Sequence, residues 1–327
     1  MTKAEQQQSV AILVPGQFNE HAVGRIDRTF SRAWIERPDA SLVTNEMRRT
    51  VRGIAAFGGI NSALIDALPN LEIIANFGVG YDSVDARHAA QRGVMVTNTP
   101  DVLTEEVADT AIGLLINTVR ELPRAESWLR DGSWARNGNY RLSRLTLRDR
   151  RAGIFGMGRI GLAIARRLEA FGLPIAYHNR HRVEGLPYEY HGTLKGLAEA
   201  VDTLISVAPG GASTEKAVNA EILSALGPNG VFVNIGRGST VDEAALAAAL
   251  AGGTIAAAGL DVFADEPNVP PALLAAPNTS LLPHVGSASE HTRRAMADLC
   301  VDNLISWFSE RRALTPVPET QKVKARS

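Results

Sequence analysis

Short runs of apolar and β-branched residues recur along the chain and alternate with segments of helical length. The first series is VAILVPG, GIAAF, LEIIANFG and GVMVTN, and a second series is AGIF, PIAYHN, DTLISVA, GVFVNIG and TIAAAGLDV. Strands that alternate with helices form parallel sheets. With 327 residues the chain also exceeds one hydrophobic core of usual size. The pattern therefore predicts an α/β protein with two Rossmann-like, doubly wound parallel-sheet domains separated by an active-site cleft.

The boundaries of these domains follow from two long helical patterns. One begins at Thr104, a plausible cap residue, soon after Pro100. The other covers residues 287–309, and its apolar residues suit packing back onto the first series of strands. We therefore expect a discontinuous substrate-binding domain, residues 1–100 with 288–327, and a nucleotide-binding domain, residues 101–287.

Composition narrows the class of partner. The formal net charge is −1, and charged residues make up 21% of the chain, so no global basicity attracts nucleic acid. The single cysteine, Cys300, can build neither a disulfide framework nor a cysteine metal site, and we expect a buried thiol.

The start, MTKAEQQQSV, lacks an apolar signal region, and no run is long enough to cross a membrane. We expect a cytoplasmic protein without a metal, and a disordered tail, TPVPETQKVKARS.

The segment GIFGMGRIG contains the pattern G-x-G-x-x-G between a predicted strand and a predicted helix. In this context Gly156 permits a tight turn, Gly158 lets the backbone approach a pyrophosphate, and Gly161 allows close packing of helix on strand. The helix N-terminus offers N–H donors and a positive dipole to phosphate. The loop therefore predicts a dinucleotide cofactor.

A basic turn, YHNRHR, follows the next predicted strand. Proteins that bind NAD usually carry an acid here for the ribose hydroxyl, and that acid would repel a 2′-phosphate. Asn179 can form hydrogen bonds and Arg180 can pair with phosphate, with Arg182 near enough to assist. The turn favours NADP, with NADPH preferred over NADH, and the alternative is a solvated cluster of surface charges.

Three further segments place polar residues where predicted strands end, at the edge of the sheet where ligands bind. They are NIGRGSTVDEAAL with Arg237, AGLDVFADEP with Asp261 and Glu266, and LLPHVGSAS with His284. Each residue alone is compatible with a structural or solvated role. Their common position beside a cofactor loop predicts a catalytic site.

With FGVGYDSVD and GIFGMGRIG ahead of these three segments, the chain resembles the D-isomer-specific 2-hydroxyacid dehydrogenase family over nearly its whole length. The resemblance implies that Arg237 holds the substrate carboxylate and keto oxygen, that His284 is the acid/base, and that Glu266 supports His284. It also implies that backbone N–H groups of Val79 and Gly80 contact the carboxylate. The segment VAPGG departs from many relatives, in which a histidine or a longer polar loop stands.

The resemblance also implies the remaining cofactor contacts. The residues assigned to the cofactor are Thr104, Gly156, Met157, Gly158, Arg159, Ile160, Asn179, Arg180, Val207, Ala208, Pro209, Ile235, Gly236, Asp261 and Gly286. Asp261 would meet the nicotinamide side. A homodimer is usual in such families.

The chemistry fits these residue types, because hydride transfer to a keto carbon builds negative charge on oxygen and needs a fixed cation and a proton donor. Within this family the chain resembles the glyoxylate/hydroxypyruvate reductases, and that resemblance implies NADPH-dependent reduction of glyoxylate and hydroxypyruvate to glycolate and D-glycerate. The alternatives are a reductase of a larger 2-keto acid, of the phenylpyruvate type or 2-ketogluconate, and a nucleotide-sensing corepressor of the same fold.

Overall fold

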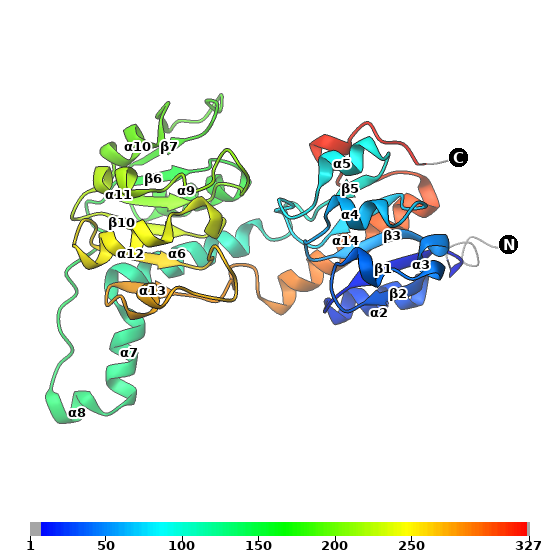
Figure 1. The fold of residues 1–327 in the computed structure, drawn as a ribbon. Coiled ribbons are helices and arrows are strands. Elements are labelled where there is room, and N and C mark those ends of the chain that lie inside the picture. Colours follow the sequence, from blue (N-terminus) through cyan, green and yellow to red (C-terminus); the bar gives the residue numbers. More distant parts are fainter. Residues whose placement is uncertain (1–7, 326–327) are drawn as a thin grey trace. The chain divides into compact units, whose positions relative to one another are not determined.

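A computed structural model describes residues 8–325 of the chain. The described residues fall into two compact units, drawn in Figure 1. Unit 1 combines the chain up to Leu103 with the segment from Ser289 onward, and unit 2 is Thr104–Ala288. Most of the N-terminal segment on which the absence of a signal region was predicted lies outside the described residues.

Unit 1 contains a five-stranded parallel sheet with the order β2-β1-β3-β4-β5. Its elements are β1 (Ala11–Pro15), α2 (Glu20–Thr29), β2 (Ser31–Ile35), η1 (Ala40–Leu42), α3 (Asn45–Thr50), β3 (Val51–Ala56), α4 (Ser62–Asp66), β4 (Ile73–Asn76), α5 (Ala86–Gln91), β5 (Met95–Thr97), α14 (Glu290–Glu310) and η3 (Pro318–Thr320). The strand order reverses beside β1, which makes the sheet doubly wound.

Unit 2 contains a seven-stranded parallel sheet with the order β12-β11-β10-β9-β6-β7-β8. Its elements are α6 (Thr104–Arg120), α7 (Leu122–Arg130), α8 (Ser133–Asn137), β6 (Ala152–Phe155), α9 (Arg159–Ala170), β7 (Ile175–His178), β8 (Glu189–Tyr190), α10 (Leu194–Ala200), β9 (Thr203–Ser206), α11 (Ala220–Leu226), β10 (Val231–Asn234), η2 (Gly238–Thr240), α12 (Glu243–Ala251), β11 (Ala257–Leu260), α13 (Pro271–Ala275) and β12 (Thr279–Leu281). The order reverses between β6 and β9, where dinucleotides bind in this architecture.

The predicted fold class, two doubly wound parallel α/β units, is confirmed. Central strands such as β6, β9, β10 and β11 are buried at every position, because helices cover both faces of the sheet. That double burial explains the predominantly apolar run by which each of them can be recognised in the sequence. Strand β2 was not predicted, because it is an edge strand with largely exposed side chains and therefore lacks an apolar run.

The expectation of a disordered tail is wrong for residues 315–320. Pro316 forms an antiparallel bridge with Thr97, and Val317 is buried. The hydroxyl of Thr320 is also buried, where it donates to the carbonyl of Val96 at 3.1 Å and accepts from the N–H of the same residue at 3.1 Å. One apolar side chain and one hydroxyl thus fix a segment whose composition is otherwise polar, while residues 326–327 lie outside the described range.

Helix α14 packs onto unit 1 as expected, and it contacts β4 and α2. Met296, Cys300, Leu304 and Trp307 are among the residues that this helix buries. The prediction of a buried thiol is confirmed, because Cys300 is buried, and that burial raises the pKa of the thiol to about 12. A thiol in this state is unreactive at neutral pH.

Candidate active site and nucleotide loop

The glycine loop lies at the switch point of unit 2, after β6, and its tight packing explains two of its glycines. A Cβ at Gly156, where φ is +105°, would lie 2.7 Å from the backbone nitrogen of Ala208. A Cβ at Gly161 would lie 2.4 Å from the carbonyl oxygen of Gly156. Gly158 is different, because a Cβ there would meet open space at the N-cap of α9. The loop therefore leaves a free approach to the helix N-terminus, which fits a pyrophosphate.

The basic turn after β7 is attached to this loop through Asn179. The Asn179 side chain accepts from the N–H of Met157 at 2.6 Å and donates to the carbonyl of Met157 at 3.3 Å. Arg180 is exposed beside it and donates through Nη2 to the hydroxyl of Ser213 at 3.1 Å. The side chain of Asn179 thus positions the loop, and the guanidinium of Arg180 stays at the surface where a phosphate can reach it.

His284 and Glu266 form the central pair of the site. His284 Nδ1 lies 2.7 Å from Glu266 Oε2, and about a third of each side chain is exposed. The second oxygen of Glu266 accepts from the N–H of Phe263 at 3.0 Å, so each of the two carboxylate oxygens has a hydrogen-bond partner. With Nδ1 bonded to a carboxylate, Nε2 is the ring nitrogen left to bond a ligand, and a proton-transfer role for it stays a prediction.

Asp261 fixes the loop that carries His284. This buried carboxylate accepts from the N–H groups of Val285 at 2.7 Å and Gly286 at 2.9 Å. Its backbone carbonyl accepts from the N–H of His284, where φ is +52°. Burial raises the pKa of Asp261, and the two N–H bonds act in the opposite direction. These bonds hold His284 in a backbone conformation that non-glycine residues rarely adopt.

Arg237 occupies the turn between β10 and η2. The buried side chain of Asn234 donates to the carbonyl of Arg237 at 2.9 Å and accepts from the N–H of Gly236 at 3.1 Å. A Cβ on Gly238 would lie 1.8 Å from the carbonyl carbon of Phe263, so the Arg237 turn packs directly on the segment that leads to Glu266. Arg237 and the His284–Glu266 pair therefore belong to neighbouring turns at one edge of the sheet.

The other assigned cofactor residues of unit 2 lie around the same switch point. Ala208, after β9, also lies close to Gly236, because a Cβ on that glycine would lie 2.8 Å from the Ala208 carbonyl oxygen. Thr104 is the first residue of α6 rather than its cap. Met157, Gly158, Arg159 and Ile160 span the glycine loop and the start of α9, Val207 and Pro209 flank Ala208, and Ile235 follows β10. Their cofactor contacts stay predictions.

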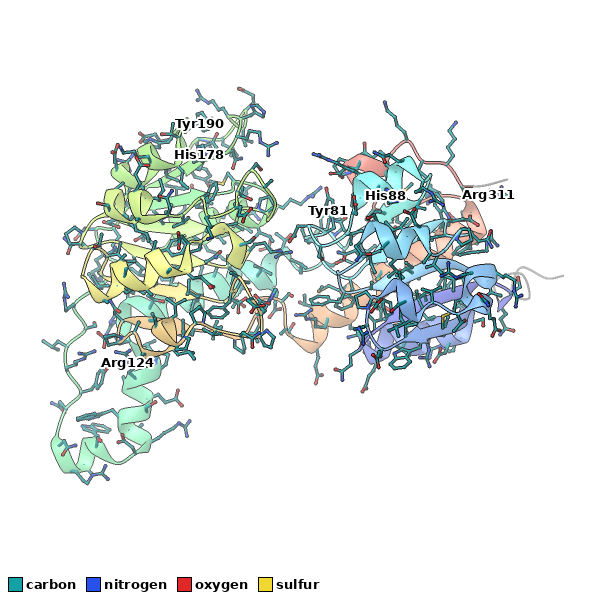
Figure 2. All side chains as sticks on the ribbon, viewed as in Figure 1. Tyr81, His88, Arg124, His178, Tyr190 and Arg311 are labelled. Atoms are coloured by element: carbon teal, nitrogen blue, oxygen red, sulfur yellow. The ribbon has the colours of Figure 1, made fainter. Side chains whose placement is uncertain are left out.

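In unit 1 side-chain amides hold the backbone of the loop after β4. The side chain of Asn76 donates to the carbonyls of Gly78 and Gly80, and Asn98 donates to the carbonyl of Val79 at 2.8 Å. Tyr81, labelled in Figure 2, donates to Glu319. The carbonyls are thus held by side chains, and within residues 8–325 no recorded bond uses the N–H of Val79 or Gly80. Their contact with substrate stays a prediction.

Sequence reasoning missed three residues that shape the site. Asn234 and Glu243 are structural supports, the latter accepting from the N–H of Ala264 at 2.9 Å. Ser213 is the partner of Arg180. Asn234 begins the NIGRGS segment and could have been suspected from that position, whereas nothing in the sequence links Ser213 to Arg180.

Two further features concern membranes and metal ions. No helix among the described residues is long and apolar enough to cross a membrane. Across residues 8–325 there is also no group of three or more His, Cys, Asp or Glu side chains placed to hold a metal ion.

The chain matches the model of a known protein family. The model of the D-isomer specific 2-hydroxyacid dehydrogenase, NAD binding domain, matches residues 112–286. The chain belongs to the D-isomer-specific 2-hydroxyacid dehydrogenase family. The predicted membership and the predicted enzyme class are thereby confirmed.

Relatives in this dehydrogenase family differ in substrate. A hydroxyphenylpyruvate reductase of Plectranthus scutellarioides is 42% identical over 95% of this chain and 99% of its own length. A 2-ketogluconate reductase of Gluconobacter oxydans is 43% identical over 82% of this chain and 86% of its own. The crystal structure of an NADPH-dependent glyoxylate/hydroxypyruvate reductase from Sinorhizobium meliloti, in complex with NADP and malonate, is 64% identical. It covers 98% of this chain and 99% of its own, with a TM-score of 0.95.

Proposed function

We propose that this dehydrogenase reduces small 2-keto acids, glyoxylate and hydroxypyruvate, to glycolate and D-glycerate with NADPH. The observation that carries the proposal is the 2.7 Å pair of His284 and Glu266 on a turn adjacent to that of Arg237, at the switch point of a dinucleotide-binding sheet. The relative of 64% identity, whose crystal structure holds NADP, supports the choice of cofactor and substrate.

The nucleotide residues fit the cofactor. The open space at Gly158 and the N-terminus of α9 would hold the pyrophosphate, and Arg180 would hold the 2′-phosphate. The nicotinamide supplies a hydride when it is bound. The residues of the chain supply binding, orientation and the proton.

In the proposed reaction Arg237 holds the carboxylate and the keto oxygen of the substrate. Negative charge grows on that oxygen as the hydride arrives, and a fixed guanidinium stabilises it. His284 donates a proton to the oxygen from Nε2, while Glu266 stabilises the imidazolium through Nδ1. Asp261 keeps the imidazole in place by holding the backbone of residues 284–286.

The substrate assignment is tested by kcat/KM with NADPH for glyoxylate, hydroxypyruvate, pyruvate and phenylpyruvate. We expect glyoxylate and hydroxypyruvate to be the best substrates, because their recognition depends on the carboxylate and keto oxygen. If phenylpyruvate is preferred by about tenfold or more, the assignment to small substrates is wrong and the hydride mechanism survives.

One observation favours the larger substrates as a second candidate. Phe18, Phe57 and Phe77 each follow a strand of the five-stranded sheet, and the ring of Phe77 contacts the other two, with centroids 5.5 Å apart for Phe18–Phe77 and 6.0 Å for Phe57–Phe77. Phe57 is 59% exposed, although it is apolar. Since Phe77 immediately precedes the Gly78–Gly80 turn, this cluster offers an apolar surface for an aromatic side chain, as the hydroxyphenylpyruvate reductase relative would need.

Steady-state kinetics test the role of Glu266. The Glu266→Gln variant keeps the size and one hydrogen-bond acceptor of the side chain but loses the negative charge beside the imidazole. We therefore expect kcat for keto-acid reduction to fall while the binding of NADPH is retained. A wild-type kcat in this variant would remove Glu266 from its assigned role.

We further propose that the chain acts in the cytoplasm as a homodimer. Helices α7 and α8 form an arm that extends from the rest of unit 2, as Figure 1 shows. Leu129, Trp134 and Leu142, on the arm and just after it, are 55%, 57% and 94% exposed. Apolar side chains gathered on a projecting arm favour contact with a second copy.

A further inference from the structure

The contact between Arg180 and Ser213 joins the two sides of the switch point. Arg180 follows β7, Ser213 lies in the loop after β9, and these strands flank β6 on opposite sides. Arg180 Nη2 donates to Ser213 Oγ at 3.1 Å, and both side chains are exposed. The guanidinium that would bind the 2′-phosphate is therefore held by a residue from the opposite side of the glycine loop.

The backbone on both sides of this contact is fixed by further bonds. Thr214 Oγ1 donates to the carbonyls of Pro209 at 2.6 Å and Gly211 at 3.1 Å, which closes the loop on itself next to Ser213. On the Arg180 side, the hydroxyl of Tyr190 donates to the carbonyl of Asn179 at 3.2 Å. Tyr190 and His178, labelled in Figure 2, lie near one another at this end of the sheet. Ser213 thus reaches Arg180 from a loop with its own internal support.

The chemistry of the two side chains makes them a joint anion site. A guanidinium has only donors, so in this contact the serine oxygen is the acceptor and its hydroxyl proton stays available. A phosphate placed beside Arg180 would then accept from the guanidinium and from the serine hydroxyl together. We propose that Ser213 is a specificity-determining residue for NADPH, which positions Arg180 and donates a hydrogen bond to the 2′-phosphate. This inference rests on the proposed use of NADPH.

The test compares ligands that differ by the 2′-phosphate. Calorimetric titrations with adenosine 2′,5′-bisphosphate and with 5′-AMP measure binding without turnover, and fluorescence titrations with NADPH and NADH extend them to the whole cofactor. Ser213→Ala should weaken the binding of NADPH and adenosine 2′,5′-bisphosphate by about threefold to tenfold. It should leave the dissociation constants of NADH and 5′-AMP unchanged. Ser213→Asp should weaken the 2′-phosphate ligands by more than about tenfold, because its carboxylate would pair with Arg180 and repel phosphate.

Two further variants sharpen the comparison. The serine Ser224, exposed on α11, provides the matched control, and Ser224→Ala should change no dissociation constant. In a double-mutant cycle the losses of binding free energy from Ser213→Ala and Arg180→Ala should be less than additive, because each substitution removes the hydrogen bond between the two side chains.

The outcomes separate this inference from the proposed function. If the wild-type chain binds adenosine 2′,5′-bisphosphate no more tightly than 5′-AMP, both the NADPH assignment and the role of Ser213 are wrong. If the wild-type chain shows the preference and both Ser213 variants keep it, Ser213 is a surface serine and only the inference fails. Equal losses of affinity for ligands with and without the 2′-phosphate in the Ser213 variants would also overturn the inference, because they would indicate a damaged loop.

Discussion

Replacing His284 by alanine should lower kcat for keto-acid reduction by about 10²-fold or more, because general acid catalysis contributes at least that much. Cofactor binding should survive. The turn at residues 284–286 is held by backbone bonds to Asp261, which do not involve the imidazole. Steady-state kinetics and fluorescence titration with NADPH measure the two quantities separately.

A histidine outside the proposed site provides the control for this variant. His88 Nε2 lies 2.9 Å from Asp66 in unit 1, and we give it no part in catalysis. The His88→Ala variant should keep the wild-type kcat. A His284→Ala enzyme with nearly wild-type kcat would show that another group donates the proton.

The second large effect concerns the cofactor. Arg180→Ala should weaken the binding of NADPH by roughly tenfold to a hundredfold and leave the binding of NADH nearly unaffected. Only NADPH carries the phosphate that pairs with the guanidinium. Dissociation constants for both cofactors, measured at one stated ionic strength, check the expectation, since salt screens an exposed pair.

Arg148 offers a matched arginine for comparison. It is exposed in the same unit and lies outside the assigned nucleotide residues. Arg148→Ala should leave both dissociation constants unchanged. Equal losses for NADPH and NADH in the Arg180→Ala variant would mean that the turn does not read the phosphate.

The sequence was sufficient for the fold class and for placing most candidate site residues just after strands. Strands buried on both faces are predominantly apolar, so β6, β9, β10 and β11 can be recognised as short apolar runs even though β9 and β10 also contain buried Thr203, Ser206 and Asn234. Ligand-binding residues in such sheets follow the strands directly, which identifies Arg237, Asp261, Glu266 and His284 from their order in the chain. Edge strand β2 and the segment 315–320 lacked that signal, because exposed elements carry polar side chains.

Tertiary structure decided how these residues are used. The side chain of Asn179 bonds to the backbone of Met157, a contact that the sequence did not predict, and its contact with the cofactor stays a prediction. The carboxylate of Asp261 likewise accepts from the N–H groups of Val285 and Gly286, and its place beside the nicotinamide stays a prediction. The partnership of Arg180 with Ser213 crosses 33 positions of the chain. A sequence determines which residue types are available at each strand end, but hydrogen bonds form between groups that the folded sheet brings within about 3 Å, and that proximity exists only in three dimensions.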